Sequence, residues 1–336
     1  MGVIADRLLL VQTSPRLPAG LLSWQGWQAL HSGPVYAADP DSAQARAVRA
    51  SGLPVARLAA EGNRELAAAF RDRARGVGVA VWLSGPDGDP GFARALVELL
   101  TGGHPDHAGG ELEVVYGSWD PPGARLLDAV ATMDRLRSPG GCPWDAAQTH
   151  RTLMPYLLEE AYEAYDALED GDPVALREEL GDVLLQVLFH ARLAEEAAPP
   201  EAPWSVDDVA GDLVGKLVRR HPHVFDGVPV SGPEELHANW ERIKRAEKGR
   251  TSVTEGVPMA LPALALAAAL QRRAARAGLP DRPPSAGTGA GGSAELGARL
   301  FDLVREATAA GQDAEAALRT VCRAYRDALV AAERPG

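Results

Sequence analysis

The chain has 336 residues, of which 46% are hydrophobic and 24% charged, and its formal net charge is −12 at pH 7. At about 150 residues per domain, this length predicts two or three globular domains. The strong negative charge argues against nucleic acid or an anionic membrane as the main partner. Cys142 and Cys322 lie too far apart in sequence for a disulfide framework or a cysteine-rich zinc module.

The N-terminus and the apolar runs predict a protein that stays in the cytoplasm. No apolar run approaches the roughly 20 residues that a membrane helix needs. The first 18 residues lack the basic segment, the long apolar segment and the cleavage site of a secretory signal. We therefore expect a cytoplasmic protein with no membrane partner and no stable nucleic-acid binding.

Residues 1–118 have the pattern of a small α/β domain. Short apolar runs that predict strands alternate with Ala- and Arg-rich stretches that predict helices. In chain order these segments lie at 8–11, 42–50, 61–75, 77–83, 91–100 and 111–116.

From Pro121 onward, long helical periodicities replace the strand signals. The first expected helices lie at 126–136, at 152–168 with Pro155 in the first turn, and from Pro173 to about 196 with Asp172 as N-cap. Further helices are expected after Ser205, from Pro233 to near Gly249, over 260–270, and as a pair within 294–333. Asp208, three residues after Ser205, forms a pattern like that of a capping box.

These patterns predict a mainly α chain in five parts. In order, they are a small α/β domain at 1–118, a helical domain at 125–250, a connecting helix at 251–277, a Gly-, Pro- and Ser-rich flexible linker at 278–293, and a last helical segment at 294–333.

The sharpest feature is an acidic stretch between positions 159 and 182, with ten carboxylates and one basic residue. Glu160 and Glu163 are three residues apart on one predicted helix, and Glu179 and Asp182 are three apart on the next. Two antiparallel helices would turn these pairs toward each other. Crowded carboxylates repel unless a cation compensates them, and Mg²⁺ or Mn²⁺ prefers oxygen ligands.

Besides a metal site, the acidic stretch is compatible with two further structures. One is a solvated acidic helix face, the usual place of a charge run. The other is a di-iron bundle, which the absence of a Glu-x-x-His pattern argues against. Spacing also leaves open whether Glu159 or Glu160 points inward, because both lie within about 60° of Glu163 on a helical wheel.

A group of motifs around this stretch resembles the MazG family of nucleoside triphosphate pyrophosphohydrolases. The matching motifs are MDRLR at 133–137, GCPWD at 141–145, QTH at 148–150, YLLEEAYE at 156–163, EELGDVLLQV at 178–187, RRHPHVF at 219–225 and WERIK at 240–244. The resemblance implies an all-α helical bundle that assembles as a homodimer. It also implies hydrolysis of a nucleoside triphosphate to the monophosphate and pyrophosphate.

Carried onto this sequence, the family pattern implies that Glu160, Glu163, Glu179 and Asp182 bind Mg²⁺. Glu159 becomes a general-base candidate beside Glu160 and Glu163, which gives three expected catalytic carboxylates. The expected substrate-binding residues are basic side chains for the phosphates and tryptophans for base stacking: Lys216, Arg219, Arg220, Lys244, Trp144 and Trp240. A solvated basic face and ordinary tryptophan packing are the alternatives for these residues.

The end of the chain contains an echo of the first acidic helix pair. Glu295-Leu296-Gly297-Ala298 resembles Glu179-Leu180-Gly181-Asp182, but Ala298 replaces the aspartate and the linker 278–293 stands where an acidic helix would precede it. If the echo is more than chance, this second copy binds no metal and serves packing or dimerisation. The N-terminal region weakly resembles a shortened tetrapyrrole methylase-like domain, for which we expect no methyl transfer.

The sequence thus favours an Mg²⁺-dependent nucleoside triphosphate pyrophosphohydrolase that acts in nucleotide-pool house-cleaning. The alternative is a non-catalytic nucleotide-binding or regulatory protein. A pure binder gains nothing from four mutually repelling carboxylates, which argues for the enzyme.

Overall fold

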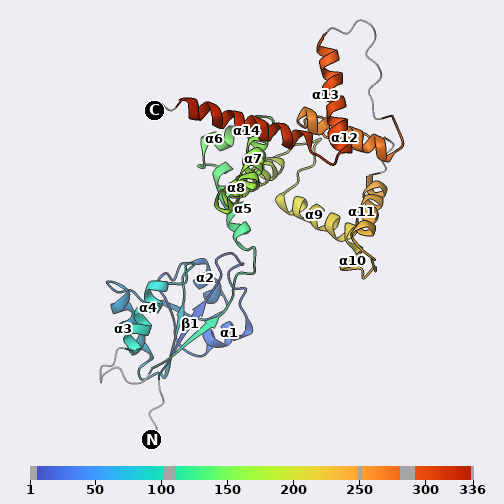
Figure 1. Cartoon of the computed structure of the whole chain (residues 1–336). Coiled ribbons are helices and arrows are strands. Elements are labelled where there is room, and N and C mark those ends of the chain that lie inside the picture. Colours follow the sequence, from blue (N-terminus) through green and yellow to red (C-terminus); the bar gives the residue numbers. More distant parts are fainter. Residues whose placement is uncertain (1–5, 102–109, 249–251, 281–291, 334–336) are drawn as a thin grey trace. The chain divides into compact units, whose positions relative to one another are not determined.

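A computed structural model describes residues 6–101, 110–248, 252–280 and 292–333 (Figure 1). The chain divides into two compact units, Met1–Ala210 and Gly211–Gly336. The predicted helical domain at 125–250 has residues in both units, and the five-part division of the chain stays a prediction. None of the described helices is long and apolar enough to span a bilayer.

The N-terminal part of the first unit is a five-stranded parallel sheet with helices on both faces. The strand order is β3-β2-β4-β1-β5. In chain order, the elements are β1 Asp6–Gln12, α1 Trp24–His31, β2 Val35–Ala37, α2 Ala43–Ala50, β3 Val55–Arg57, α3 Asn63–Ala74, β4 Val79–Leu83, α4 Pro90–Thr101 and β5 Gly110–Tyr116.

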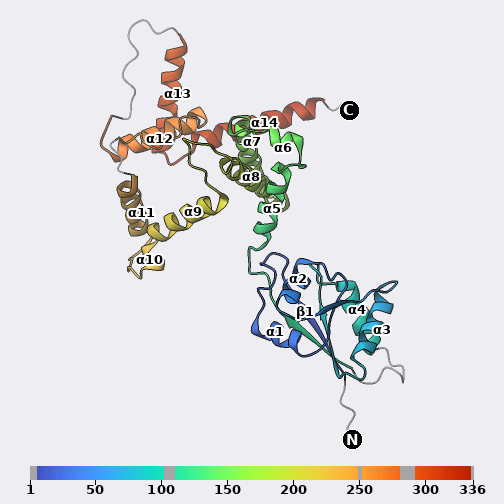
Figure 2. The same ribbon diagram turned by 180° about the vertical axis from the view of Figure 1, so that it is seen from behind.

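Strand alternation explains why this sheet has a core on each side. In β1, Leu9 and Val11 pack into one core with residues of α1 and α2, whereas Leu8 and Leu10 pack into the other with residues of α3 and α4. Figures 1 and 2 show α3 and α4 together on one side of the sheet and α1 on the other. The predicted small α/β domain is confirmed.

The long helices after Pro121 are also confirmed. The first unit contains α5 Arg125–Arg137, α6 Pro143–Ala147, α7 His150–Asp170 and α8 Pro173–Ala194. Helix α9, Val206–Arg220, begins in the first unit and ends in the second, which also contains α10 Pro222–Phe225, α11 Pro233–Lys248, α12 Ala263–Arg276, α13 Gly292–Ala309 and α14 Ala314–Glu333. Most of the expected linker, residues 281–291, lies outside the described residues.

Helix α7 starts two residues earlier than its periodicity predicts. Thr149 and Thr152 form a reciprocal capping box, and the Thr152 amide donates to the Thr149 hydroxyl at 3.2 Å. Pro155 therefore lies in the second turn, and its expected place in the first turn is wrong. The strong N-cap outweighs the single backbone hydrogen bond that a proline removes.

A tight turn reverses the chain between α7 and α8. Gly171 has a φ of 67°, a left-handed conformation that glycine adopts at helix ends. The Asp172 carboxylate then accepts from the amides of Val174 and Ala175 at 2.9 and 3.1 Å, so the expected N-cap is confirmed. This two-residue connection sets α7 and α8 antiparallel and side by side.

A small apolar core holds α5, α7 and α8 together. Met133 of α5, Leu153 of α7 and Leu188 and Phe189 of α8 are each at most 7% exposed. The core lies near the start of α7 and the end of α8. Glu160 and Asp182 lie farther along the hairpin, between this core and the turn at Gly171.

Candidate metal centre and nucleotide site

Three of the predicted ligands come together on the α7–α8 hairpin. Ligand atoms of Glu160, Glu179 and Asp182 all lie within 4.8 Å of one another, and each side chain is half-buried. Glu160 comes from α7, whereas Glu179 and Asp182 lie one turn apart on α8. Among the described residues, this is the one group of three or more acidic, histidine or cysteine side chains close enough to share an ion.

Glu163 completes the cluster as a fourth, more exposed carboxylate. Its negative charge acts on Glu160, one turn before it on α7, and on Glu179 across the hairpin. Glu159 is exposed, and its charge has the weakest effect on Glu160. The structure therefore turns Glu160, and not Glu159, into the space between the helices.

The electrostatics of the cluster are those of a site that lacks positive charge. Burial, followed by the charges of Asp182 and Glu163, raises the pKa of Glu160 above its ordinary value. Burial, followed by Glu163 and Asp182, raises the pKa of Glu179. The anionic forms are disfavoured because the oxygens have lost water and face one another. Three carboxylates with oxygens within 4.8 Å of one another, with the charge of Glu163 acting on two of them, fit a hard divalent cation.

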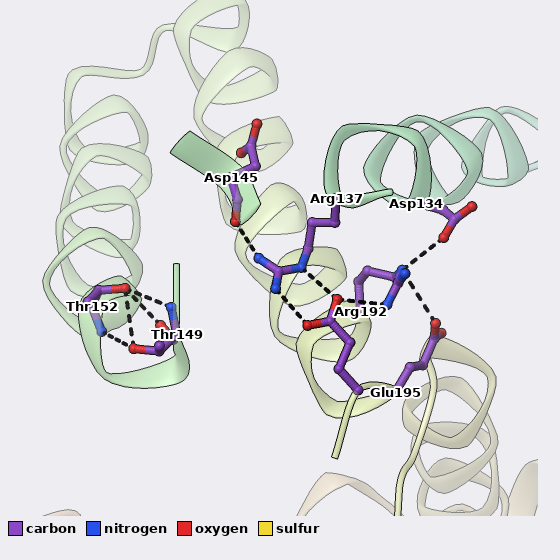
Figure 3. Close-up of polar contacts among 8 residues, drawn as sticks. Asp134, Arg137, Asp145, Thr149, Thr152, Arg192 and Glu195 are labelled. Carbon is purple, nitrogen blue, oxygen red and sulfur yellow. Dashed lines mark hydrogen bonds and ion pairs between the residues drawn. The ribbon is translucent and has the colours of Figure 1, made fainter. Parts of the chain in front are cut away.

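A nearly buried arginine fixes the short helix α6 against this hairpin. The Arg137 side chain is 4% exposed, and it holds the Glu196 carboxylate with two nitrogens at 2.8 and 3.1 Å. It also donates to the backbone carbonyl of Asp145 in α6, as Figure 3 shows. Arg192 of α8 bonds the same Glu196 at 3.0 Å and Asp134 of α5 at 2.9 Å, so one network joins α5, α6 and α8.

The two glycines before α6 make its approach possible. Gly140 has a φ of 79°, which favours glycine. A Cβ atom at Gly141 would overlap the carbonyl oxygen of Leu136 and lie 2.5 Å from that of Arg135. The Cys142 amide donates to the Leu136 carbonyl at 2.7 Å, so the chain turns back tightly onto the end of α5.

This turn places Trp144 beside α7. The Trp144 ring lies edge-on to Tyr156, with centroids 6.2 Å apart, and the two residues are 53% and 40% exposed. Tyr156 comes four residues before Glu160 and seven before Glu163 on the same helix face. An exposed aromatic pair thus adjoins the carboxylate cluster. Tyr156 is not among the predicted site residues, although this spacing could have indicated it.

The predicted phosphate-binding residues lie on α9 and α11, in the second unit. Arg219 and Arg220 bond the Glu247 carboxylate at 3.2 and 2.8 Å, and the Arg220 guanidinium lies 5.7 Å from the centre of the Trp240 ring. Lys216 is exposed on α9, and the side chain of Lys244 lies outside the described residues. Within this unit, Glu247 brings Arg219, Arg220 and Trp240 into one group.

Two histidines lie across the hairpin from each other at its other end. His150 begins α7 and His190 lies near the end of α8, with their Nδ1 atoms 2.8 Å apart and their rings stacked. Burial, followed by the neighbouring His150, lowers the pKa of His190, which favours its neutral form. The contact joins the ends of the two helices.

Comparisons with known proteins agree with this geometry. The MazG nucleotide pyrophosphohydrolase domain matches residues 148–225, which include all four carboxylates of the cluster. The chain is 51% identical over 248 residues to the uncharacterized 26.1 kDa protein in the blaB 3′ region of Streptomyces cacaoi, a match that covers 74% of this chain and 98% of that protein.

Several relatives have names that state an activity. The nucleoside triphosphate pyrophosphohydrolase of Mycolicibacterium smegmatis is 46% identical over 205 residues, which cover 58% of this chain and 61% of that protein. The nucleoside triphosphate pyrophosphohydrolase/pyrophosphatase MazG of Thermotoga maritima is 41% identical over 165 residues, which cover 48% of this chain and 61% of that protein. The chain thus spans less than two thirds of these named relatives.

Among solved structures, the crystal structure of a mazG-related protein from Thermotoga maritima matches with 27% identity and a TM-score of 0.30. That match covers 36% of this chain and 97% of the other. The family domain over 148–225 includes the helices that carry the carboxylate cluster, and the three relatives above are 41–51% identical to this chain. The chain belongs to the MazG family.

Proposed function

We propose that the protein is an Mg²⁺-dependent nucleoside triphosphate pyrophosphohydrolase that acts in nucleotide-pool house-cleaning in the cytoplasm. The observation that carries the proposal is the cluster of four carboxylates on α7 and α8, three of which have ligand atoms within 4.8 Å of one another. The names of the mycobacterial and thermotogal relatives give further support.

In this proposal Glu160, Glu163, Glu179 and Asp182 hold the cation. When bound, Mg²⁺ (or Mn²⁺) neutralises phosphate charge and lowers the barrier to departure of pyrophosphate. Glu159 lies exposed beside the cluster and acts as the general base, accepting a proton from the water that attacks the α-phosphorus. The bond from the α-phosphorus to the bridging oxygen breaks, which leaves the monophosphate and pyrophosphate.

The remaining predicted residues bind the rest of the nucleotide. Lys216, Arg219, Arg220 and Lys244 supply positive charge for the phosphates, and a phosphate would compete with Glu247 for Arg219 and Arg220. Trp144 and Trp240 offer flat surfaces for a base. The exposed fractions of Trp144 and of its neighbour Tyr156 support this role for Trp144.

We also propose that two copies form a homodimer through this hairpin. Leucines on both helices remain exposed within the described chain: Leu158 by 54%, Leu168 by 61% and Leu180 by 53%. Apolar side chains at this density on adjacent helices favour burial against another helix pair. Light scattering of the purified protein would give twice the 35.4 kDa chain mass, whereas a monomer would contradict the homodimer.

The test of the activity is pyrophosphate release from a panel of nucleoside triphosphates with Mg²⁺. We expect wild type to release pyrophosphate, and Glu163→Ala and Asp182→Ala to lose that activity while keeping their helical circular dichroism. Glu295→Ala, in the echo at the start of α13, is the matched control and should keep full activity. Nucleotide binding without hydrolysis in wild type would favour the alternative, a non-catalytic nucleotide-binding protein.

A further inference from the structure

Two contacts fix the alignment of α7 against α8. Glu160 of α7 lies beside Asp182 of α8, and His150 of α7 lies beside His190 of α8. Each such pair marks one level along the axis of the hairpin. Because the helices are antiparallel, residues between these levels pair in reverse order. Tyr156 and Gln186 are each four residues from the Glu160–Asp182 level, on α7 and α8 respectively, so they share the next level of the interface.

Gln186 is buried at this level with an unsatisfied polar atom. It is 4% exposed, and its carbonyl oxygen has no hydrogen-bond partner within the described residues. It lies one turn from Asp182 and one turn from His190, on the helix face that meets α7. A buried acceptor without a donor is costly, and such an atom commonly has a partner in a water or a ligand.

The aromatic pair lies at the same level. Tyr156 belongs to it directly, and Trp144 is brought to Tyr156 by the turn at Gly140 and Gly141 and by the bond from Arg137 to the Asp145 carbonyl. Half-exposed aromatic rings beside a buried amide offer both a stacking surface and a hydrogen-bond acceptor. These are the two elements with which proteins bind a flat heterocycle.

The level is also at a suitable distance from the carboxylate cluster. Four helical residues correspond to about 6 Å along the axis, so Tyr156 and Gln186 lie one turn from Glu160 and Asp182. A nucleotide whose triphosphate is held at the cluster would have its ribose beside the helical turn between Glu160 and Tyr156. Its base would then lie next to Tyr156 and Gln186. Tyr156 is 40% exposed, so part of the residue is open to solvent at this level.

We propose that Gln186 determines base specificity, accepting a hydrogen bond from the exocyclic amine of the substrate base while Tyr156 and Trp144 stack on its ring. This inference rests on the proposed function, and it adds the class of substrate: nucleotides whose base carries an amino group are favoured over those with a keto group there. Adenine and cytosine donate at this position, whereas hypoxanthine and uracil present a carbonyl that repels the Gln186 oxygen.

The test compares kcat/KM for ATP with ITP and for CTP with UTP, because each pair differs at this position. Wild type should favour the amino base by about fivefold to tenfold, the effect of one hydrogen bond. Gln186→Met keeps the volume and removes the acceptor, and should bring both ratios to about one. Gln271→Met, at a second buried glutamine in α12, is the control that should leave them unchanged.

Further variants distinguish a loss of base specificity from a general loss of nucleotide binding or of folding. Trp144→Leu should raise KM for all four nucleotides together and leave both ratios as in wild type. If Gln186→Met does not fold, as judged by circular dichroism, Gln186→Asn withdraws the acceptor by one methylene and should lower the ratios in the same way. Ratios that stay unchanged in the folded Gln186 variant, or a wild type that favours ITP and UTP, would overturn the inference.

The inference and the proposed function fail in different ways. If wild type hydrolyses none of the four nucleotides, the proposed activity is wrong, and dissociation constants from calorimetry with Mg²⁺ then replace kcat/KM in the same comparison. Tighter binding of ATP than ITP, lost in Gln186→Met, would support the role of Gln186 without catalysis. Equal dissociation constants for ATP and ITP, or no binding of any nucleotide, would overturn the role of Gln186.

Discussion

The helix pairs α7–α8 and α12–α13 share a short sequence and differ in chemistry. Each contains a Glu-Leu-Gly stretch on its second helix and a nearly buried glutamine. In the first pair, α7 contributes Glu160 and Glu163 opposite Glu179 and Asp182. In the second, the helix that packs against α13 is α12, with the sequence ALALAAALQRRAAR, which has arginines and no acid.

The position of the stretch within its helix differs as well. Glu179 lies in the seventh position of α8, where its side chain faces α7, whereas Glu295 lies in the first turn of α13. A carboxylate in the first turn interacts favourably with the helix dipole, so Glu295 has a structural reason to be there. Helix α12 packs against α13, whereas most of the linker 278–293 lies outside the described residues, so its expected place in front of the second copy stays a prediction.

The two buried glutamines differ in one contact, although the side-chain carbonyl oxygen of each lacks a hydrogen-bond partner within the described residues. Gln271 of α12 donates to the carbonyl of Phe301 in α13 at 2.8 Å, so one end of its amide joins the two helices. Gln186 lies one turn from Asp182, on the helix that carries two of the carboxylates. Similar helices can therefore carry a site or only a packing contact, depending on what the partner helix contributes.

The largest effect should come from neutralising one carboxylate of the first pair. Glu160→Gln should lower kcat by about 100-fold or more, because a cation ligand and its charge are lost. The same change should raise the melting temperature measured without Mg²⁺, because it removes a charge whose burial and repulsion by Asp182 and Glu163 raise the pKa of Glu160. Activity assays would measure the expected loss of kcat, and thermal unfolding in the presence of a chelator would measure the expected rise in melting temperature.

Glu295→Gln is the matched change in the second pair. It should leave kcat unchanged and lower the melting temperature slightly, because it removes a favourable dipole interaction. Equal effects of the two changes on kcat would contradict the division of roles between the pairs.

A smaller effect should come from adding or removing Mg²⁺. A cation that binds only the folded state at 100 times its dissociation constant stabilises by about 2.7 kcal/mol. Wild type should therefore melt at a higher temperature with Mg²⁺ than with a chelator, and Asp182→Asn should show little of that difference. Differential scanning fluorimetry at constant ionic strength would measure it, and an equal shift in Asp182→Asn would place the cation elsewhere.

Next in size is the effect of a methyl group at the turn that positions Trp144. Gly141→Ala forces its Cβ into the carbonyl of Leu136, and such overpacking costs typically about 1–3 kcal/mol. The variant should unfold at a lower denaturant concentration and show a changed Trp144 environment in fluorescence. Gly171→Ala tests a different strain at the α7–α8 turn, where φ is positive but space is open, and should leave the Trp144 environment as in wild type.

The sequence predicts much of the fold and of the carboxylate cluster. The features that it does not predict are very short strands and contacts between separate helices. The periodicity and caps of α7 and α8 predict two long helices, and spacing predicts that their acids meet. Strands β2 and β3 have three residues each, too few for an alternation to be recognised. The bond from Arg137 to Asp145 and the burial of Gln186 depend on how separate helices pack, which local sequence does not encode.

The smallest expected effect concerns the glycine that both stretches share. A Cβ atom at Gly181 or at Gly297 meets nothing within 4 Å. Replacing a glycine within a helix by alanine usually stabilises by about 0.5–1 kcal/mol, so both Gly181→Ala and Gly297→Ala should raise the free energy of unfolding of the isolated chain.

The proposed homodimer changes this expectation at one of the two positions. Gly181 is adjacent to Leu180, which is 53% exposed, so a second chain that covers α8 would come close to it. In a dimer through the α7–α8 hairpin, Gly181→Ala should weaken association while Gly297→Ala still stabilises. Analytical ultracentrifugation of the two variants would show this difference, and equal behaviour would mean that the space beside Gly181 is open in the assembled protein as well.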